Sequence, residues 1–152
     1  MLLNIGITAL LLMVTTTIHA AAMMLALQRI KVEGSPSTMR LTRIYRVGGI
    51  VMLMFLAALL EVLAWAVTYL VLNAIQGLEK ALYFSMVTFT TLGYGEIVLD
   101  EQWRLLSSFE AANGIIMFGW STAIVITAVQ RLYSGEIKKS SHNTESNNDK
   151  ES

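Results

Sequence analysis

Five consecutive residues carry the clearest chemistry in this sequence: Thr91-Leu92-Gly93-Tyr94-Gly95. Two glycines alternate with larger residues there, and glycine permits backbone angles that other residues resist. The segment is therefore expected to run extended and to leave its carbonyl oxygens without the regular partners of a helix or a sheet. A path for a cation is the natural use of carbonyl oxygens presented in this way.

Few other side chains point to chemistry. The sequence has no cysteine, which excludes a disulfide framework and thiolate sites. The histidines, His19 and His142, lie in an apolar run and a polar tail, and neither has a partner at metal-ligand spacing. No Ser-His-Asp set, phosphate-binding loop or carboxylate pair is evident, so we expect no enzyme activity and no cofactor. Lys and Arg total 11, as do Asp and Glu, and this balance indicates no nucleic-acid partner.

The composition is typical of an integral membrane protein, because 55% of the residues are hydrophobic, 14% are charged and the mean hydropathy is +0.57. Leu2–Leu27 contains no charged residue, and neither does Ala111–Val129. Val47–Leu72 contains one, Glu61. Helices of these lengths cross the hydrocarbon core of about 30 Å. We therefore predict three spanning helices.

The apolar, threonine-rich segment Ala81–Thr91 lies between the second and third spans. As a helix of about eleven residues it reaches about 16 Å, roughly half of a bilayer. It can enter a membrane but cannot cross it. The backbone that follows is tolerated at that depth only where it is buried in protein or lines a watery path.

Here the sequence resembles the pore region of potassium channels, whose selectivity filter reads Thr-x-Gly-Tyr-Gly after a further threonine, as Thr90 precedes Thr91. The resemblance extends over about Val47–Leu132 and corresponds to the minimal unit of two helices and a pore loop. Leu92 stands where valine is usual, and Glu96 where aspartate is usual. Neither difference removes a carbonyl ligand.

The resemblance implies that K⁺ is bound by the carbonyl oxygens of Thr91, Leu92, Gly93 and Tyr94 and by the Thr91 hydroxyl, within a filter that ends at Gly95. One chain supplies one filter strand, and a cation coordinated from all sides needs four, so a homotetramer is implied. The expected partners are identical subunits, membrane lipids and K⁺. The expected activity is passive, selective conduction of potassium.

The expected fold is an all-α membrane protein with three transmembrane helices, a re-entrant pore helix and a filter. We divide the chain into an N-terminal helix (1–28), a basic cytoplasmic linker (29–46), a pore domain (47–132) and a disordered cytoplasmic tail (133–152). Within the pore domain we expect an outer helix at 47–73, a pore helix at 80–90, the filter at 91–95 and an inner helix at 106–132.

Several further residues are candidates for support or gating. A carboxylate at Glu61 is costly inside a membrane, so we expect it to face protein, either as a buttress of the pore helix or as a proton-sensitive gating element. Glu110 could support the filter from behind or be an interfacial charge. Thr90 and Glu96 flank the filter. Gly114 and Gly119 are candidate hinges of the inner helix, although glycine also permits close helix packing.

Basic residues predict the orientation, since they gather on the cytoplasmic side of membrane proteins. They lie before the second span and after the third, at Arg29, Lys31, Arg40, Arg43, Arg46, Arg131, Lys138 and Lys139. This predicts an external N-terminus and a cytoplasmic C-terminus, and the small size suits a bacterial inner membrane. A cleaved signal peptide at the start is an alternative, but no Lys or Arg precedes the apolar run.

A voltage-gated channel, a potassium transporter and a modulatory subunit are the alternatives to this interpretation. Potassium transporters that use pore-like loops carry four loops in one much longer chain, usually with a single filter glycine, whereas this sequence has one loop with two glycines. Arg40, Arg43 and Arg46 recur every third residue, as gating charges of voltage sensors do, but anchoring at the membrane surface also explains them. The chain could also be a non-conducting or weakly selective cation-channel-like subunit that modulates a partner. Such a subunit would need no intact filter. The gating stimulus is not evident from the sequence.

Overall fold

The computed structural model describes the backbone of residues 2–30 and 39–151 and the side chains of residues 2–28 and 44–130. The regular secondary structure of this part of the chain is all helical: α1 (Leu2–Ile30), α2 (Met39–Val71), α3 (Leu78–Phe89) and α4 (Arg104–Glu151). Three stretches are long and apolar enough to cross a membrane, Leu2–Gln28, Ile44–Val71 and Arg104–Gln130. The all-helical class and the three apolar helices are therefore confirmed for the described residues.

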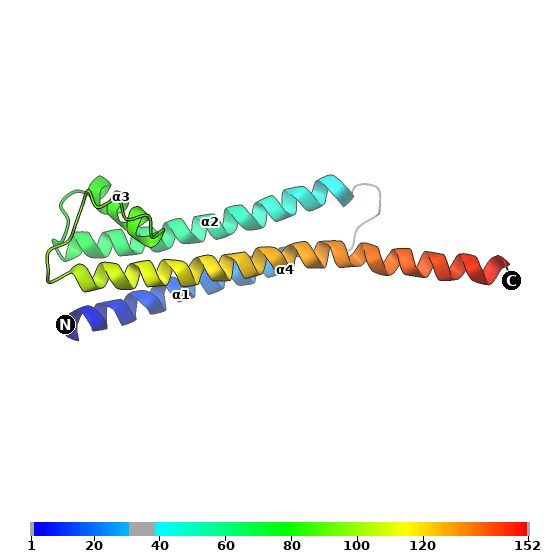
Figure 1. Cartoon of the computed structure of the whole chain (residues 1–152), viewed down its shortest axis with the longest axis horizontal. Helices are drawn as coiled ribbons and strands as arrows, with labels where there is room; N and C mark the ends of the chain where they lie inside the picture. Colours follow the sequence, from blue (N-terminus) through cyan, green and yellow to red (C-terminus); the bar gives the residue numbers. More distant parts are fainter. Residues whose placement is uncertain (1, 31–38, 152) are drawn as a thin grey trace.

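The three long helices lie side by side, and the short helix α3 folds back at one end of them (Figure 1). α1 and α4 run in the same direction, and α2 runs opposite to both. α1 contacts α2 and α4, and α3 contacts the same two helices from another side. α3 and the N-terminus lie at the same end of the bundle, and the C-terminus lies at the other end (Figure 1).

The core has two parts along the bundle. Near α3, Trp65 and Tyr69 of α2 pack with Phe89 of α3 and Leu106 of α4. Farther from α3, small and branched side chains of the long helices pack together: Ala22, Ala26, Ile50, Met54, Ile124 and Ala128. Many large apolar side chains outside these clusters remain exposed, including Phe55 at 56% and Ile115 at 62%. Faces of this kind suit lipid or further copies of the chain.

Two helices extend into regions that the sequence assigns to other elements. α2 begins at Met39, inside the expected linker 29–46, because the Met, Arg and Leu residues there favour a helix. Residues 31–38 of that linker lie outside the described residues. α4 continues to Glu151, so its backbone is helical through most of the expected disordered tail 133–152. No proline interrupts α4, and a helix propagates more easily than it nucleates. The division of the chain into the four predicted segments is not tested by these helix boundaries and stays a prediction.

Candidate functional site

After the last residue of α3, the chain turns back toward the end of the bundle at which the N-terminus lies (Figure 1). The twelve residues of α3 span about 18 Å, so this helix covers only part of a bilayer. At its C-terminus, the Thr91 amide donates to the Thr88 carbonyl at 2.9 Å, and the Leu92 amide donates to the Val87 carbonyl at 2.9 Å. This pair of bonds is the Schellman pattern, which requires a left-handed residue just after the helix. Thr91 occupies that position with φ of 59°.

The segment predicted as the filter has an alternating backbone. Thr91, Gly93 and Gly95 have positive φ angles of 59°, 55° and 81°, whereas Leu92 and Tyr94 do not. No helix or strand includes these five residues. In a strand, successive carbonyl groups point to opposite sides. A positive φ angle at every second residue breaks that alternation of the carbonyl directions. The glycines explain why the chain tolerates two of the three left-handed positions.

This segment is uncovered in a single chain. Every residue from Thr91 to Glu96 is exposed, and the large side chains of Leu92 and Tyr94 are 54% and 64% exposed. A cavity of about 160 Å³ lies behind it, between α3 and the start of α4, with Phe84 and Leu99 in its lining. Exposed apolar side chains of this size suit contact with lipid or with a further copy of the chain.

Glu110 joins three helices behind the segment. Its side chain is fully buried in α4. It accepts a hydrogen bond of 2.6 Å from the Tyr69 hydroxyl of α2, and its other oxygen lies 2.5 Å from the Ser85 hydroxyl of α3. The alternative prediction, that Glu110 is a charge at the membrane interface, does not fit this buried environment. Tyr69 and Ser85 were not among the site residues predicted from the sequence, although a serine in a short apolar helix is a signal for a buried polar contact.

Ser85 has two acceptors within reach but only one hydroxyl proton. Its Oγ lies 2.9 Å from the Val62 carbonyl of α2 and 2.5 Å from Glu110 Oε1. A proton on Glu110 Oε1 satisfies both contacts, because Glu110 can then donate to Ser85 while Ser85 donates to Val62. The geometry thus accommodates a neutral Glu110, which suits a carboxyl group that has no cationic partner within hydrogen-bond distance among the described residues.

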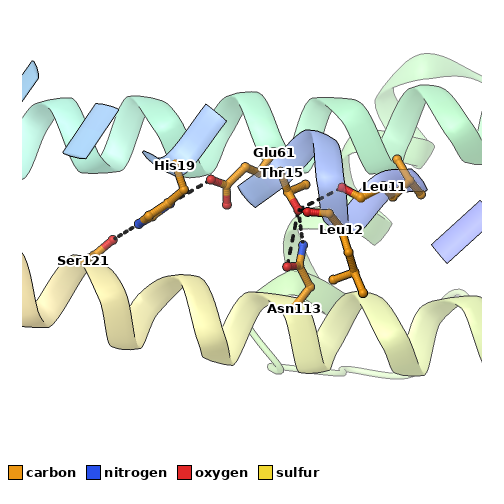
Figure 2. Close-up of polar contacts among 7 residues, drawn as sticks. All are labelled: Leu11, Leu12, Thr15, His19, Glu61, Asn113 and Ser121. Carbon is orange, nitrogen blue, oxygen red and sulfur yellow. Dashed lines mark hydrogen bonds and ion pairs between the residues drawn. The ribbon is translucent and has the colours of Figure 1, made fainter. Parts of the chain in front are cut away.

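Among the described residues, Glu61 makes its side-chain hydrogen bond to α1 and none to α3. Its Oε1 lies 2.8 Å from His19 Nδ1, and both side chains are fully buried. The other ring nitrogen of His19, Nε2, lies 3.2 Å from the Ser121 hydroxyl of α4. Figure 2 shows His19 between these two partners, so one side chain of α1 connects α2 with α4. Glu61 Oε2 has no hydrogen-bond partner among the described residues.

The two candidate hinge glycines lie in different surroundings. Gly114 packs against the end of α3, where an added Cβ would lie 1.9 Å from the Phe89 carbonyl oxygen. Gly119 has open space around it, with nothing within 4 Å of an added Cβ. The geometry thus favours close packing as the reason for a glycine at position 114. Gly119 makes no such close contact, so its role as a hinge stays a prediction.

The remaining predicted residues flank the segment. The Thr90 hydroxyl donates to the Met86 carbonyl of its own helix at 2.7 Å. Glu96 accepts a hydrogen bond of 2.8 Å from the exposed Tyr83 hydroxyl of α3. This hydrogen bond is the main cause that raises the pKa of Tyr83 above its ordinary value of 10.0, followed by desolvation and the charge of Glu96.

Comparisons with known proteins give one result that bears on function. The model of a protein family described as "Ion channel" matches residues 55–131, about half of the chain. The match covers most of α2, all of α3 and the apolar part of α4, and it leaves α1 outside. No curated protein and no solved structure matches the chain.

Proposed function

Because the chain belongs to the ion channel family, we propose that it is a subunit of a potassium-selective channel that conducts K⁺ passively through a filter at Thr91–Gly95. The observation that carries this proposal is the alternation of positive φ angles at Thr91, Gly93 and Gly95. This alternation occurs directly after a helix that covers only part of a bilayer. Carbonyl oxygens of such a segment can replace the hydration shell of a permeating ion.

Four copies would complete the site. The exposed side chains of Leu92 and Tyr94 and the exposed apolar face of α4 at Ile115 and Phe118 support an assembly in which copies cover one another. Rings of carbonyl oxygens form only when equivalent strands surround one axis, and four strands match the filters of known potassium channels. In this arrangement α3 is the pore helix, and its carbonyl end, near Thr90, faces the ion path.

The proposed membrane placement is supported by the position of α3 and the N-terminus at the same end of the bundle (Figure 1). If the basic residues near Arg46 lie in the cytoplasm, the N-terminus and the filter mouth lie outside and α4 leads inward. Glu96 and Asp100, both exposed, would then give the outer mouth a negative charge that attracts cations. A bacterial inner membrane suits a chain of this size.

The test is flux from liposomes that contain the purified protein. A potassium gradient should drive flux, and a sodium gradient of the same size should not. Gly93→Ala should abolish the potassium flux, because Gly93 has φ of 55° and alanine resists that angle. Gly48→Ala is the matched control, because Gly48 lies in α2 with open space around an added Cβ.

The outcomes separate the candidate functions. Potassium flux that persists in Gly93→Ala would show that the ion does not pass through this segment. Equal sodium and potassium fluxes would indicate a weakly selective cation channel. A folded tetramer that conducts neither ion at any pH or voltage would contradict the proposal and favour a subunit that modulates a partner.

A further inference from the structure

α1 carries a row of polar side chains that the ion channel family match does not include. Asn4, Thr8, Thr15 and His19 are all buried, with exposed fractions between 0% and 6%. Their spacing of four, seven and four residues keeps them on one face of a helix. A helix that only anchored the chain in lipid would not need a buried polar face, because polar groups inside a membrane are retained where they contact protein.

These side chains contact α4 or the loop before it at three levels. The Asn4 amide donates to the Gln102 carbonyl at 2.6 Å, just before α4 begins. The Asn113 amide of α4 donates to the Thr15 hydroxyl at 3.1 Å. His19 Nε2 lies 3.2 Å from the Ser121 hydroxyl. Because α1 and α4 run in the same direction, the contacts follow one another along both helices (Figures 1 and 2).

Two of these contacts lie on opposite sides of Gly119. Asn113 precedes this glycine and Ser121 follows it, and Gly119 itself has nothing within 4 Å of an added Cβ. Gly119 itself therefore makes no side-chain contact, and α1 contacts α4 on both sides of it. α1 is also fixed to α2, because His19 Nδ1 lies 2.8 Å from Glu61.

We propose that α1 is a splint that holds α4 straight across Gly119, and that the contact between His19 and Ser121 opposes bending of the C-terminal half of α4. The proposal rests on the proposed function, in which α4 is the inner helix and its bending widens the path for ions. His19 and Ser121 are positioning residues in this scheme, since neither touches the permeant ion. Opening then requires the loss of one partly buried hydrogen bond between α1 and α4.

The critical variant is Ser121→Ala, which removes the hydrogen bond between His19 and α4 and leaves both the pair of His19 and Glu61 and the ring contact of His19 with Trp120 intact. Flux per tetramer in liposomes should rise by about threefold, which corresponds to an average hydrogen bond between membrane helices, and by at most about twentyfold. Thr127→Val is the matched control on the same helix. The Thr127 hydroxyl donates only to the Ala123 carbonyl of α4 in the described contacts, so flux should not change.

A second set of variants, made in the Gly119→Ala protein, distinguishes the proposed role of the contact from a merely structural one. If the splint acts across Gly119, then Gly119→Ala stiffens α4, and Ser121→Ala should have no further effect on flux in that background. If Ser121 only stabilises the fold, Ser121→Ala should lower the melting temperature and the flux in both backgrounds. That second pattern would overturn the proposal.

Hydrogen exchange of the α4 amides, followed by mass spectrometry, tests the splint without relying on conduction. Exchange in residues 120–130 should be faster in Ser121→Ala than in the wild type, and unchanged in Thr127→Val. If the wild type conducts but neither flux nor exchange responds to Ser121→Ala, the splint is wrong and the channel stands. If the wild type does not conduct, the proposed function fails, and exchange alone decides whether α1 holds α4.

Discussion

Gly114 of α4 and Phe89 of α3 approach so closely that a Cβ at Gly114 would lie 1.9 Å from the Phe89 carbonyl oxygen and 2.8 Å from its carbonyl carbon. Phe89 is the last residue of α3, and the proposed filter begins two residues later. The closest contact is with backbone atoms, which cannot rotate away as a side-chain tip can. α4 therefore supports the end of α3 directly through its backbone.

We predict that Gly114→Ala displaces the end of α3 and lowers stability. Overpacking of this kind costs about 1–3 kcal/mol. The measurement is the melting temperature of the purified assembly, with potassium flux as a second readout, and both should decrease. Gly119→Ala is the control for stability, because it adds the same methyl group to the same helix in open space. Equal melting temperatures for the two variants would contradict the close contact.

A second prediction concerns Glu110 and its two partners. In Glu110→Ala the buried Tyr69 hydroxyl loses its acceptor, and an unsatisfied buried group costs about 1–3 kcal/mol. Glu110→Gln keeps the shape and one carbonyl oxygen, and its amide can donate to Ser85 as a neutral carboxyl group does. The melting temperature should therefore fall clearly in Glu110→Ala and only slightly in Glu110→Gln.

Ser85→Ala provides the complementary test of the same cluster. Ser85→Ala leaves the carboxyl proton of Glu110 without its acceptor, but it should destabilise less than Glu110→Ala, because a smaller side chain is removed and Glu110 keeps its bond with Tyr69. A large loss of stability in Glu110→Gln, with Ser85→Ala nearly unchanged, would mean that Glu110 is ionised and that its protonated arrangement with Ser85 is wrong.

The three spans could be predicted because length and the absence of charge are local properties of the sequence. The partners of the buried carboxylates could not be predicted in this way. Glu61 was considered as a buttress of the pore helix, whereas in the structure it faces His19 of α1, and Tyr69 of the same helix contacts Glu110 behind α3. These two positions of α2 differ by about 80° in direction at 100° per residue.

The rotation of α2 about its axis decides which neighbour each side chain meets. That rotation is set by packing of Trp65, Tyr69 and Ala66 against other helices, which no single-sequence pattern contains. For the same reason, His19 could be recognised as an unusual residue in an apolar helix, but its place between Glu61 and Ser121 required the arrangement of all three long helices.

A third prediction follows from the hydrogen bond between Tyr83 and Glu96. This bond raises the pKa of Tyr83, so the protonated phenol is favoured in the folded protein. The associated stabilisation is fully present below the ordinary tyrosine pKa of about 10 and is lost as the pH rises through the higher folded value. Spectrophotometric titration should show that Glu96→Ala, which removes the acceptor, lowers the pKa of one tyrosine, and Tyr83→Phe should remove that tyrosine from the titration. An identical titration curve in Glu96→Ala would contradict the bond.

The last prediction concerns the left-handed conformation of Thr91. For a residue other than glycine, this conformation costs about 1–2 kcal/mol, and a β-branched side chain adds crowding. Thr91→Ser keeps the hydroxyl that the filter is proposed to use and relieves part of that crowding. Potassium flux should therefore persist in Thr91→Ser, with a melting temperature no lower than that of the wild type.

Thr91→Val and Thr91→Gly separate the two properties of this residue. Valine keeps the branched shape and the strain but has no hydroxyl, so potassium flux should fall without a gain in stability. Glycine relieves the strain at the end of α3 and also lacks the hydroxyl, so the melting temperature should rise while flux falls. If Thr91→Gly instead lowers the melting temperature, the left-handed conformation carries no net strain, and the Schellman ending of α3 does not account for the direction in which the chain leaves this helix.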